Sequence, residues 1–201
     1  MGESKKCDHN DGRSREEEAF RKMKPTNEVI IQPLTTPISL CFDWMQVGSL
    51  LPIADTMDNN SNNSHGNTED EHNGECCEST AEQNRAENRF YMVVFRSIRA
   101  ADADEELLYA ADAEAHEEAK RSGGLLTYWY GSLNQERECF ATCIWRSRED
   151  AIKASKLPNH LKAASLASTM YDFYDLQRYW LTFSSAGEPI FDSVASLISE
   201  Q

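Results

Sequence analysis

The sequence predicts an α+β domain of the ferredoxin-like type between residues 88 and 184, with a four-stranded antiparallel sheet. Four apolar or aromatic runs with strand character alternate with two runs at helical spacing, in the order β-α-β-β-α-β. The two middle strands are separated by only about five residues, which predicts an antiparallel hairpin. Each of the other two connections contains a helix, and both crossovers should be right-handed. Both helices should therefore cover one face of the sheet.

The first strand, residues 89–97, carries large apolar side chains at every position from Phe90 to Phe95, and therefore on both faces. A strand of this kind needs cover on both sides of the sheet. The helix that follows is expected to begin at Asp102–Glu105, with aspartate as the N-cap and glutamate three residues on, and to end at Gly123–Gly124. Helical spacing predicts that its buried stripe consists of Leu108, Ala111, Ala115 and Ala119.

The predicted hairpin consists of residues 125–132 and 138–145, which are rich in aromatic and β-branched side chains. Ser147 can cap the second helix. That helix should pause near Pro158 and restart with Asn159 as a cap.

The last strand of the domain is expected at residues 174–183. Beyond it, residues 185–201 form a tail with room for a short helix around residues 191–198. The other end of the chain, residues 1–26, is charged and short of apolar side chains, so we expect a disordered tail there.

Two further segments precede the domain. Residues 55–87 contain nine acidic residues and one basic residue, Arg85, with almost no large apolar side chain, which predicts a disordered linker. Residues 27–54 are apolar but too short to fold alone, and residues 28–34 have the character of a short strand. This segment is expected to dock on the main domain as an arm; a lid or a partner-binding segment is the alternative.

The charge and the cysteines limit the classes of partner. A formal net charge of −14 argues against nucleic acid as a partner, because phosphate binding needs a basic face. No run approaches the length of a membrane span, and the first ten residues lack the apolar core of a secretory signal. We therefore expect a cytoplasmic chain with reduced thiols, with the nucleus also open. None of the six cysteines matches a zinc spacing, so no metal is expected.

One face of the predicted sheet stays uncovered by the two helices, although it is apolar and aromatic. A small domain cannot leave such a face in water without a large exposed patch. A second copy of the chain, stacked through this face, would give a homodimer. The arm of residues 27–54 is the competing cover.

Three runs carry a family resemblance: residues 122–132 (SGGLLTYWYGS), 141–155 (ATCIWRSREDAIKAS) and 174–183 (YDLQRYWLTF). Together they resemble a family of uncharacterised fungal proteins. The step from Trp145 to Asp150 is similar to the dimeric α/β-barrel superfamily, which contains antibiotic-biosynthesis-type and haem-degrading monooxygenases. The resemblance implies a dimeric α/β barrel. In haem-degrading members a helical histidine ligates iron; that position falls on Ala164 or Ser165 here, about one turn after His160, so no cofactor is expected.

The candidate site residues are histidines, aromatics and one arginine. His116 and His160 can serve as general bases, because imidazole titrates near neutrality; a structural role is the alternative. Alternation places Tyr128 on one face of its strand and Trp129 on the other. The aromatic residues could bind a flat aromatic ligand or simply pack the core. The expected substrate-binding residues are Tyr128, Trp129, Trp145, Arg146 and Trp180.

Two functions remain open from the sequence. The first is a small enzyme, similar to cofactor-independent monooxygenases or cyclases, that acts on an aromatic or polyketide-like molecule. The second is a non-catalytic binding or scaffold protein that uses the exposed sheet face for a partner. A cavity between sheet and helices with polar groups inside would favour the enzyme, whereas helices packed flat on the sheet would exclude it.

Overall fold

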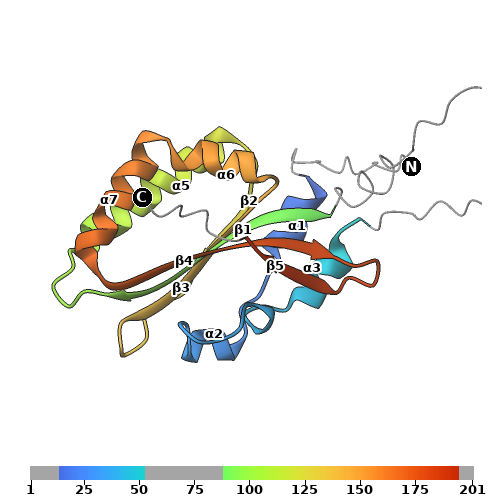
Figure 1. Ribbon diagram of the computed structural model, residues 1–201, viewed down its shortest axis with the longest axis horizontal. Helices are drawn as coiled ribbons and strands as arrows, with labels where there is room; N and C mark the ends of the chain where they lie inside the picture. The colour runs from blue at the N-terminus through green and yellow to red at the C-terminus, as the bar shows by residue number, and fades with distance from the viewer. Residues whose placement is uncertain (1–13, 53–87, 195–201) are drawn as a thin grey trace, which may run out of the picture.

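The computed structural model describes residues 14–52 and 88–194, which form a sheet between two layers of helices (Figure 1). The helices α5, α6 and α7 lie on one side of the sheet, and α1, α2 and α3 pack on the other. The helices are α1 (Arg15–Arg21), α2 (Asn27–Ile31), α3 (Trp44–Leu50), α5 (Glu105–Ser122), α6 (Arg148–Ser155), α7 (Pro158–Met170) and the short 3-10 helix η1 (Ile38–Leu40). The strands are β1 (Arg89–Arg99), β2 (Leu125–Tyr130), β3 (Glu138–Trp145), β4 (Tyr171–Phe183) and β5 (Pro189–Ser193).

The strands form one antiparallel sheet in the order β2-β3-β1-β4-β5. The central strand is β1, in which Val94 lies opposite Thr142 of β3 and Gln177 of β4. The first four strands and their connecting helices have the ferredoxin-like order, so the predicted fold class is confirmed. The predicted buried stripe of the first helix is also observed, because Leu108, Ala111, Ala115 and Ala119 are the buried residues of α5.

Strand β5 corrects two predictions, the four-stranded sheet and the short helix around residues 191–198. After β4 the chain turns through Gly187, whose φ of +78° favours glycine. The Ser184 hydroxyl accepts the Glu188 backbone N–H, and Ile190 then lies opposite Thr182. The predicted domain boundary at residue 184 is therefore too early by one strand. Residues 195–201 lie outside the described part of the chain.

The sheet face opposite α5 and α7 is covered by an N-terminal arm, which we define as residues 14–52. Phe42 of the arm packs edge-on against Trp129 of β2, with ring centroids 5.2 Å apart. Phe20 packs edge-on against Phe90 of β1, with ring centroids 4.8 Å apart. Burial of this much apolar surface is the main force that holds the arm in place. The arm's own contribution to the core is Ala19, Phe20, Met23, Val29, Cys41, Phe42, Trp44, Val47 and Leu51.

The arm begins earlier than the sequence predicts. Helix α1 lies inside the segment expected to be a disordered tail, so that prediction is wrong for residues 14–26. Ser14 starts the helix with a capping box: its hydroxyl accepts the Glu17 N–H, and the Glu17 carboxylate accepts the Ser14 N–H. Phe20 then places its ring in the core, only 1% exposed. Residues 1–13 lie outside the described part.

The short strand predicted at residues 28–34 is a helix instead, α2. Thr36, a buried residue, stabilises the end of this helix because its hydroxyl donates to the carbonyls of Glu28 and Gln32, at 3.0 and 2.8 Å. Both carbonyls also accept backbone N–H groups, from Gln32 at Glu28 and from Thr35 and Thr36 at Gln32, and the single hydroxyl hydrogen of Thr36 is shared between them. The β-branched residues of the segment favour a strand, but tertiary contacts override that preference.

Arg96 of β1 fixes the loop after α2 to the sheet. This arginine is only 5% exposed, and its Nη2 donates to the Thr36 carbonyl at 2.7 Å. Its Nη1 donates to the Pro33 carbonyl, and its guanidinium lies over the ring of Phe140. A buried cation needs hydrogen bonds of this kind, so removal of Arg96 would also leave the loop carbonyls unsatisfied.

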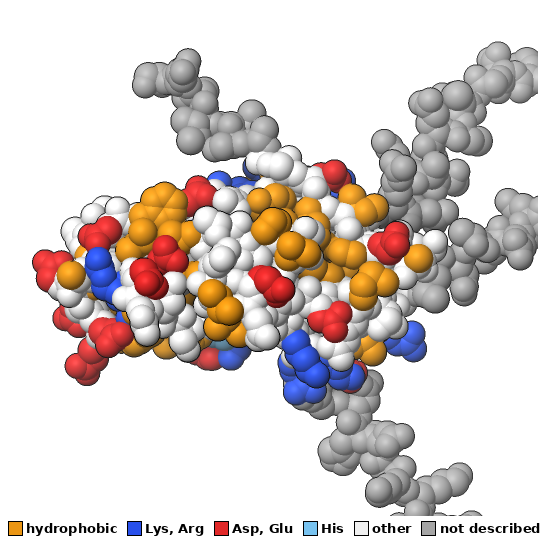
Figure 2. Space-filling view, turned by 90° about the horizontal axis from the view of Figure 1, so that it is seen from below, with side chains coloured by type: hydrophobic (Ala, Val, Ile, Leu, Met, Phe, Trp, Pro, Cys, Tyr) orange, Lys and Arg blue, Asp and Glu red, His pale blue; other side chains and the backbone are white. Residues whose placement is uncertain are grey.

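The arm removes the argument for a dimer built on the free sheet face. That face is not exposed, so the surface proposed for a scaffold protein and for a stacked homodimer is occupied by the chain itself. A homodimer stays a prediction, through some other surface. Figure 2 views the arm side of the molecule, where apolar side chains are interspersed with polar and charged ones. The exposed large apolar residues of the arm are Ile30, Ile31, Leu40, Met45 and Leu50.

The acidic segment of residues 55–87, for which disorder is predicted, lies outside the described residues. Within residues 14–52 and 88–194, none of the helices is long and apolar enough to span a membrane.

Candidate functional site

A cavity of about 240 Å³ lies between the sheet and the helices α5 and α7. The helices contribute small side chains, and the strands contribute aromatic rings. An alanine side chain occupies little of the space between a helix and the sheet, whereas a longer side chain at the same position would fill it. The helical alanines are Ala111, Ala115, Ala119, Ala163, Ala164 and Ala167, and the aromatic residues of the strands are Phe95, Tyr128, Tyr130, Trp145, Tyr171 and Tyr174.

Helix α7 lies over the cavity rather than on a packed core, since none of its thirteen residues is buried. Its N-cap, Leu157, has no side-chain hydrogen bond. Glu118 of α5 takes that role: its Oε2 accepts the N–H groups of Asn159 and His160, at 3.0 and 3.2 Å. A carboxylate suits a helix N-terminus, so Glu118 positions α7, in place of the cap expected at Asn159.

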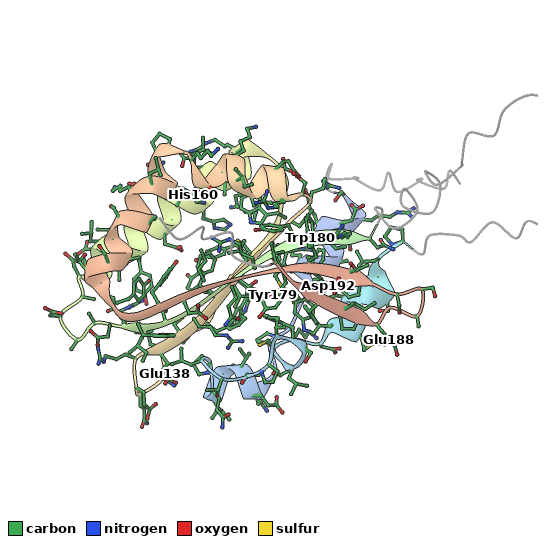
Figure 3. All side chains as sticks on the ribbon, viewed as in Figure 1. Glu138, His160, Tyr179, Trp180, Glu188 and Asp192 are labelled. Carbon is green, nitrogen blue, oxygen red and sulfur yellow. The ribbon has the colours of Figure 1, made fainter. Side chains whose placement is uncertain are left out.

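His160 lies beneath the first turn of α7, between the helix and the sheet (Figure 3), and lines the cavity. Its Nδ1 lies 3.6 Å from Glu118 Oε2. This nitrogen is buried and has no hydrogen-bond partner among the described residues. The same oxygen of Glu118 therefore accepts the backbone N–H of His160 and lies near the Nδ1 of its ring.

His116 lines the same cavity from α5, with its ring 5.0 Å from that of Tyr128. Burial lowers the pKa of His116 below the ordinary imidazole value, and the positive charge of Lys120 lowers it further. The charges of Asp112 and Glu117 oppose the shift without cancelling it. At neutral pH His116 is therefore an uncharged imidazole that can accept a proton.

Tyr128 is locked to α5 by a hydrogen bond in which its hydroxyl donates to Asp112 Oδ1 at 2.7 Å. Burial and the Asp112 carboxylate both raise the pKa of Tyr128 far above the ordinary phenol range. This phenol stays protonated and keeps its donor bond. Tyr128 thus holds Asp112, and presents an aromatic face beside His116.

Trp145 and two cysteines come from the same face of β3. The Trp145 indole N–H donates to Cys143 Sγ at 3.0 Å. Burial raises the pKa of the Cys143 thiol to about 12, so this cysteine is a neutral thiol. Cys139 also lines the cavity, and burial raises its pKa too. The two side chains are apolar lining, without nucleophilic character at neutral pH.

Three of the predicted substrate-binding residues lie outside this cavity, whereas Tyr128 and Trp145 line it. Trp129 points to the arm side of the sheet, against Phe42. Trp180 points to the helix side (Figure 3), but packs against Tyr91 and lies under Arg89, outside the cavity.

Arg146 is the third of these residues, and it contacts the arm. Its Nη2 donates to the Ser14 hydroxyl at 3.2 Å, and its Nη1 lies 3.7 Å from Glu16 Oε2. Arg146 therefore helps to hold the start of α1, and it is not among the residues that line the cavity.

The cavity also contains polar residues that the sequence analysis did not single out: Arg99, Tyr109, Asp112, Tyr171 and Tyr174. One signal could have identified Asp112. It lies one residue after Ala111 and three before Ala115, at the edge of the predicted buried stripe. Arg99 and Tyr171 had no such signal, because a bulge between β1 and β4 sets their position.

The chemistry available in the cavity is proton transfer next to aromatic surface. Within the described ranges, no group of three or more His, Cys, Asp or Glu residues is arranged to hold a metal ion. Two imidazoles on neighbouring helices can accept and return protons, and the tyrosine rings can stack on a flat ligand.

Two solved structures are similar to slightly less than half of this chain. A conserved protein from Methanosarcina mazei Go1 is 13% identical, with a TM-score of 0.41, covering 47% of this chain and 94% of its own. SnoaB, a cofactor-independent oxygenase from Streptomyces nogalater, is 10% identical, with a TM-score of 0.37, covering 45% of this chain and 90% of its own. Similarity at this level carries no inference about chemistry.

Sequence comparison gives a closer relationship. The UPF0643 protein PB2B2.08 of Schizosaccharomyces pombe (strain 972 / ATCC 24843) is 30% identical over 103 residues, covering 48% of this chain and 47% of the relative. The chain thus matches about half the length of this curated relative. A family model described as PB2B2.08-like matches residues 74–192, more than half of the chain and all of the residues that line the cavity. This chain belongs to the PB2B2.08-like family.

Proposed function

We propose that the protein is a small enzyme that binds a flat aromatic or polyketide-like molecule in the cavity and acts on it without a bound metal or cofactor. The observation that carries the proposal is the composition of the cavity: two histidines among aromatic rings and small alanines, all lining the same space. A flat ligand fits between the alanines of the helices and the rings of the strands, where it replaces water on apolar surface.

The proposed first step is proton removal by His116. The neutral imidazole takes a proton from an acidic C–H or O–H group of the ligand, with the resulting carbanion or enolate stabilised by its own aromatic system. His160, which lines the same cavity from the neighbouring helix, is the proposed group that returns a proton later in the reaction.

The carbanion has two productive routes. In an oxygenation it adds O2 to give a hydroperoxide, and loss of water leaves a ketone, so one CH2 group and one O2 give one C=O group and one H2O. In a cyclisation it attacks a carbonyl carbon of the same molecule, and the proton returns to the new alkoxide. Both routes are favoured where apolar surface, here aromatic rings and alanines, limits the access of water to the carbanion.

The test uses 1,8-dihydroxyanthrone, which has an acidic CH2 group between two rings, with oxidation to the quinone followed by absorbance and by O2 consumption. The native protein should bind this probe saturably in calorimetry and accelerate quinone formation above the rate in buffer. His116→Gln should keep binding and lose most of the acceleration, by roughly a hundredfold, the typical contribution of a general base.

A pair of matched variants separates the cavity from the rest of α7. Ala164→Phe fills the cavity and should abolish binding, whereas Ser165→Phe, one residue away and outside the lining, should leave binding unchanged. Absence of any saturable binding to the native protein would refute the proposal. Binding of the probe without turnover would favour the competing reading, a non-catalytic binding protein.

A further inference from the structure

The guanidinium of Arg99 stands at the wall of the cavity with only part of its hydrogen-bonding capacity in use. Its side chain is 11% exposed, and Arg99 is among the residues that line the cavity. Nη1 donates to Glu105 Oε1 at 2.6 Å and to the Tyr109 hydroxyl at 3.3 Å. Nε is buried and has no partner among the described residues.

The backbone fixes this arrangement. Arg99 follows the bulge between β1 and β4, where it pairs with Tyr171. Its N–H donates to the Arg137 carbonyl at 2.9 Å, and its own carbonyl accepts a hydrogen bond from the Arg137 guanidinium. Its side chain lies over the ring of Tyr109, which limits its movement. A buried cation with an unused N–H group is unfavourable unless another group completes its hydrogen bonds.

From this geometry we infer that Arg99 is the anion-binding group of the cavity, and that the ligand is an aromatic molecule that carries a carboxylate or an ionised enol. A carboxylate can take the side-on edge of a guanidinium, formed by Nε and Nη2, with two parallel hydrogen bonds. This edge is the one that Glu105 and Tyr109 do not use. The inference rests on the proposed function, because it names the ligand class of the same cavity.

The negative charge of Asp112 determines the orientation of the ligand in the cavity. The Asp112 carboxylate already accepts the Tyr128 hydroxyl, and it repels a second anion. The ligand's anionic group therefore lies toward Arg99, and its rings lie toward His116 and Tyr128, where the proton is removed. The competing outcome is a cationic ligand held by Asp112.

The experiment measures the affinity of three two-ring probes for the full-length protein by calorimetry: 2-naphthoate, its neutral isostere 2-naphthamide, and the cation 2-naphthylmethylammonium. We expect the native protein to bind naphthoate roughly ten- to a hundredfold more tightly than naphthamide, the effect of one charge-assisted hydrogen-bonded pair. Arg99→Gln should remove this preference. Arg89→Gln, which removes a guanidinium of the same strand outside the cavity, should retain it.

A surface variant guards against misfolding of Arg99→Gln. Glu105 is 62% exposed in its side chain, so Glu105→Gln should fold normally and remove a negative charge beside the Arg99 guanidinium. It should tighten naphthoate binding roughly two- to fivefold and leave naphthamide unchanged. Equal affinity for naphthoate and naphthamide, or tighter binding of the ammonium probe, would overturn the anion site and leave the proposed function standing. Failure of all three probes to bind would overturn both.

Discussion

The phenol of Tyr128 on β2 donates a 2.7 Å hydrogen bond to the carboxylate of Asp112 on α5, and so ties an edge strand of the sheet to the helix that lines the cavity. Removal of the hydroxyl in Tyr128→Phe should lower the free energy of unfolding by about 1.5–3 kcal/mol, the usual value for a hydrogen bond to a charged group. Tyr130→Phe is the control, since Tyr130 is exposed. Equal urea midpoints for the two variants would contradict the prediction.

The second prediction concerns the titration of His116. Because burial and Lys120 lower its pKa, its NMR titration midpoint should lie below the ordinary value of about 6.5. Lys120→Ala should raise the midpoint, and Asp112→Asn should lower it further, since Asp112 opposes the shift. A native midpoint above 6.5, or no response to Lys120→Ala, would contradict the assignment.

The same shift makes stability depend on pH. The unfolded chain binds a proton at His116 more tightly than the folded protein does. The contribution of His116 to the free energy of unfolding is therefore fully present above the unfolded pKa. This contribution is lost as the pH falls from about 6.5 toward the lower folded pKa. Urea denaturation between pH 5 and 7 should therefore show a smaller decline for His116→Gln than for the native protein.

Glu118→Ala should loosen α7 without unfolding the sheet. The variant removes the acceptor of two N–H groups at the start of the helix, which should cost about 1–2 kcal/mol, as for loss of an N-cap. Amide exchange should increase at Asn159 and His160 and stay unchanged in β1. Glu114 lies on the same helix as Glu118 and makes an exposed ion pair with Lys162 of α7. Glu114→Ala removes this pair and should have little effect on amide exchange. Comparable exchange in both variants would refute the capping role.

Phe42→Ala should release the arm. Phe42 is buried and contacts three aromatic rings, so its truncation should cost about 3–5 kcal/mol. Exposure of the sheet face should make the arm sensitive to protease and make the protein associate with rising concentration in light scattering. Met45→Ala, on the exposed side of the arm, should do neither. A protease-resistant, non-associating Phe42→Ala protein would contradict the prediction.

The ferredoxin-like core was predictable because its strands are apolar or aromatic runs and its helix ends carry clear signals, such as Gly123 with a φ of +85°. The N-cap of α5 is Asp104, two residues after the Asp102 that a glutamate three residues on had indicated. The arm was less predictable. Val29, Ile30 and Ile31 have strand preferences, and the burial of Val29 in the core and the hydrogen bonds of Thr36 favour the helix instead. Strand β5 was missed because a five-residue edge strand has little periodicity of its own.

The cavity was partly predictable for a similar reason. Alternation correctly put Tyr128 on one face and Trp129 on the other, so only one of the two could line a pocket beneath the helices. The convergence of Arg99, Asp112 and His116 could not be read from the sequence. It depends on a bulge and on how closely the alanines of α5 let that helix approach the sheet.

The arm also changes how the sheet face responds to dilution. A cover supplied by a second molecule dissociates when the protein becomes scarce, whereas a tethered cover remains at a high effective concentration set by the length of the connection. Residues 53–87 provide that connection here. The core beneath the arm is therefore complete in every single molecule, at any level of expression, and the protein does not need to find a copy of itself to finish folding.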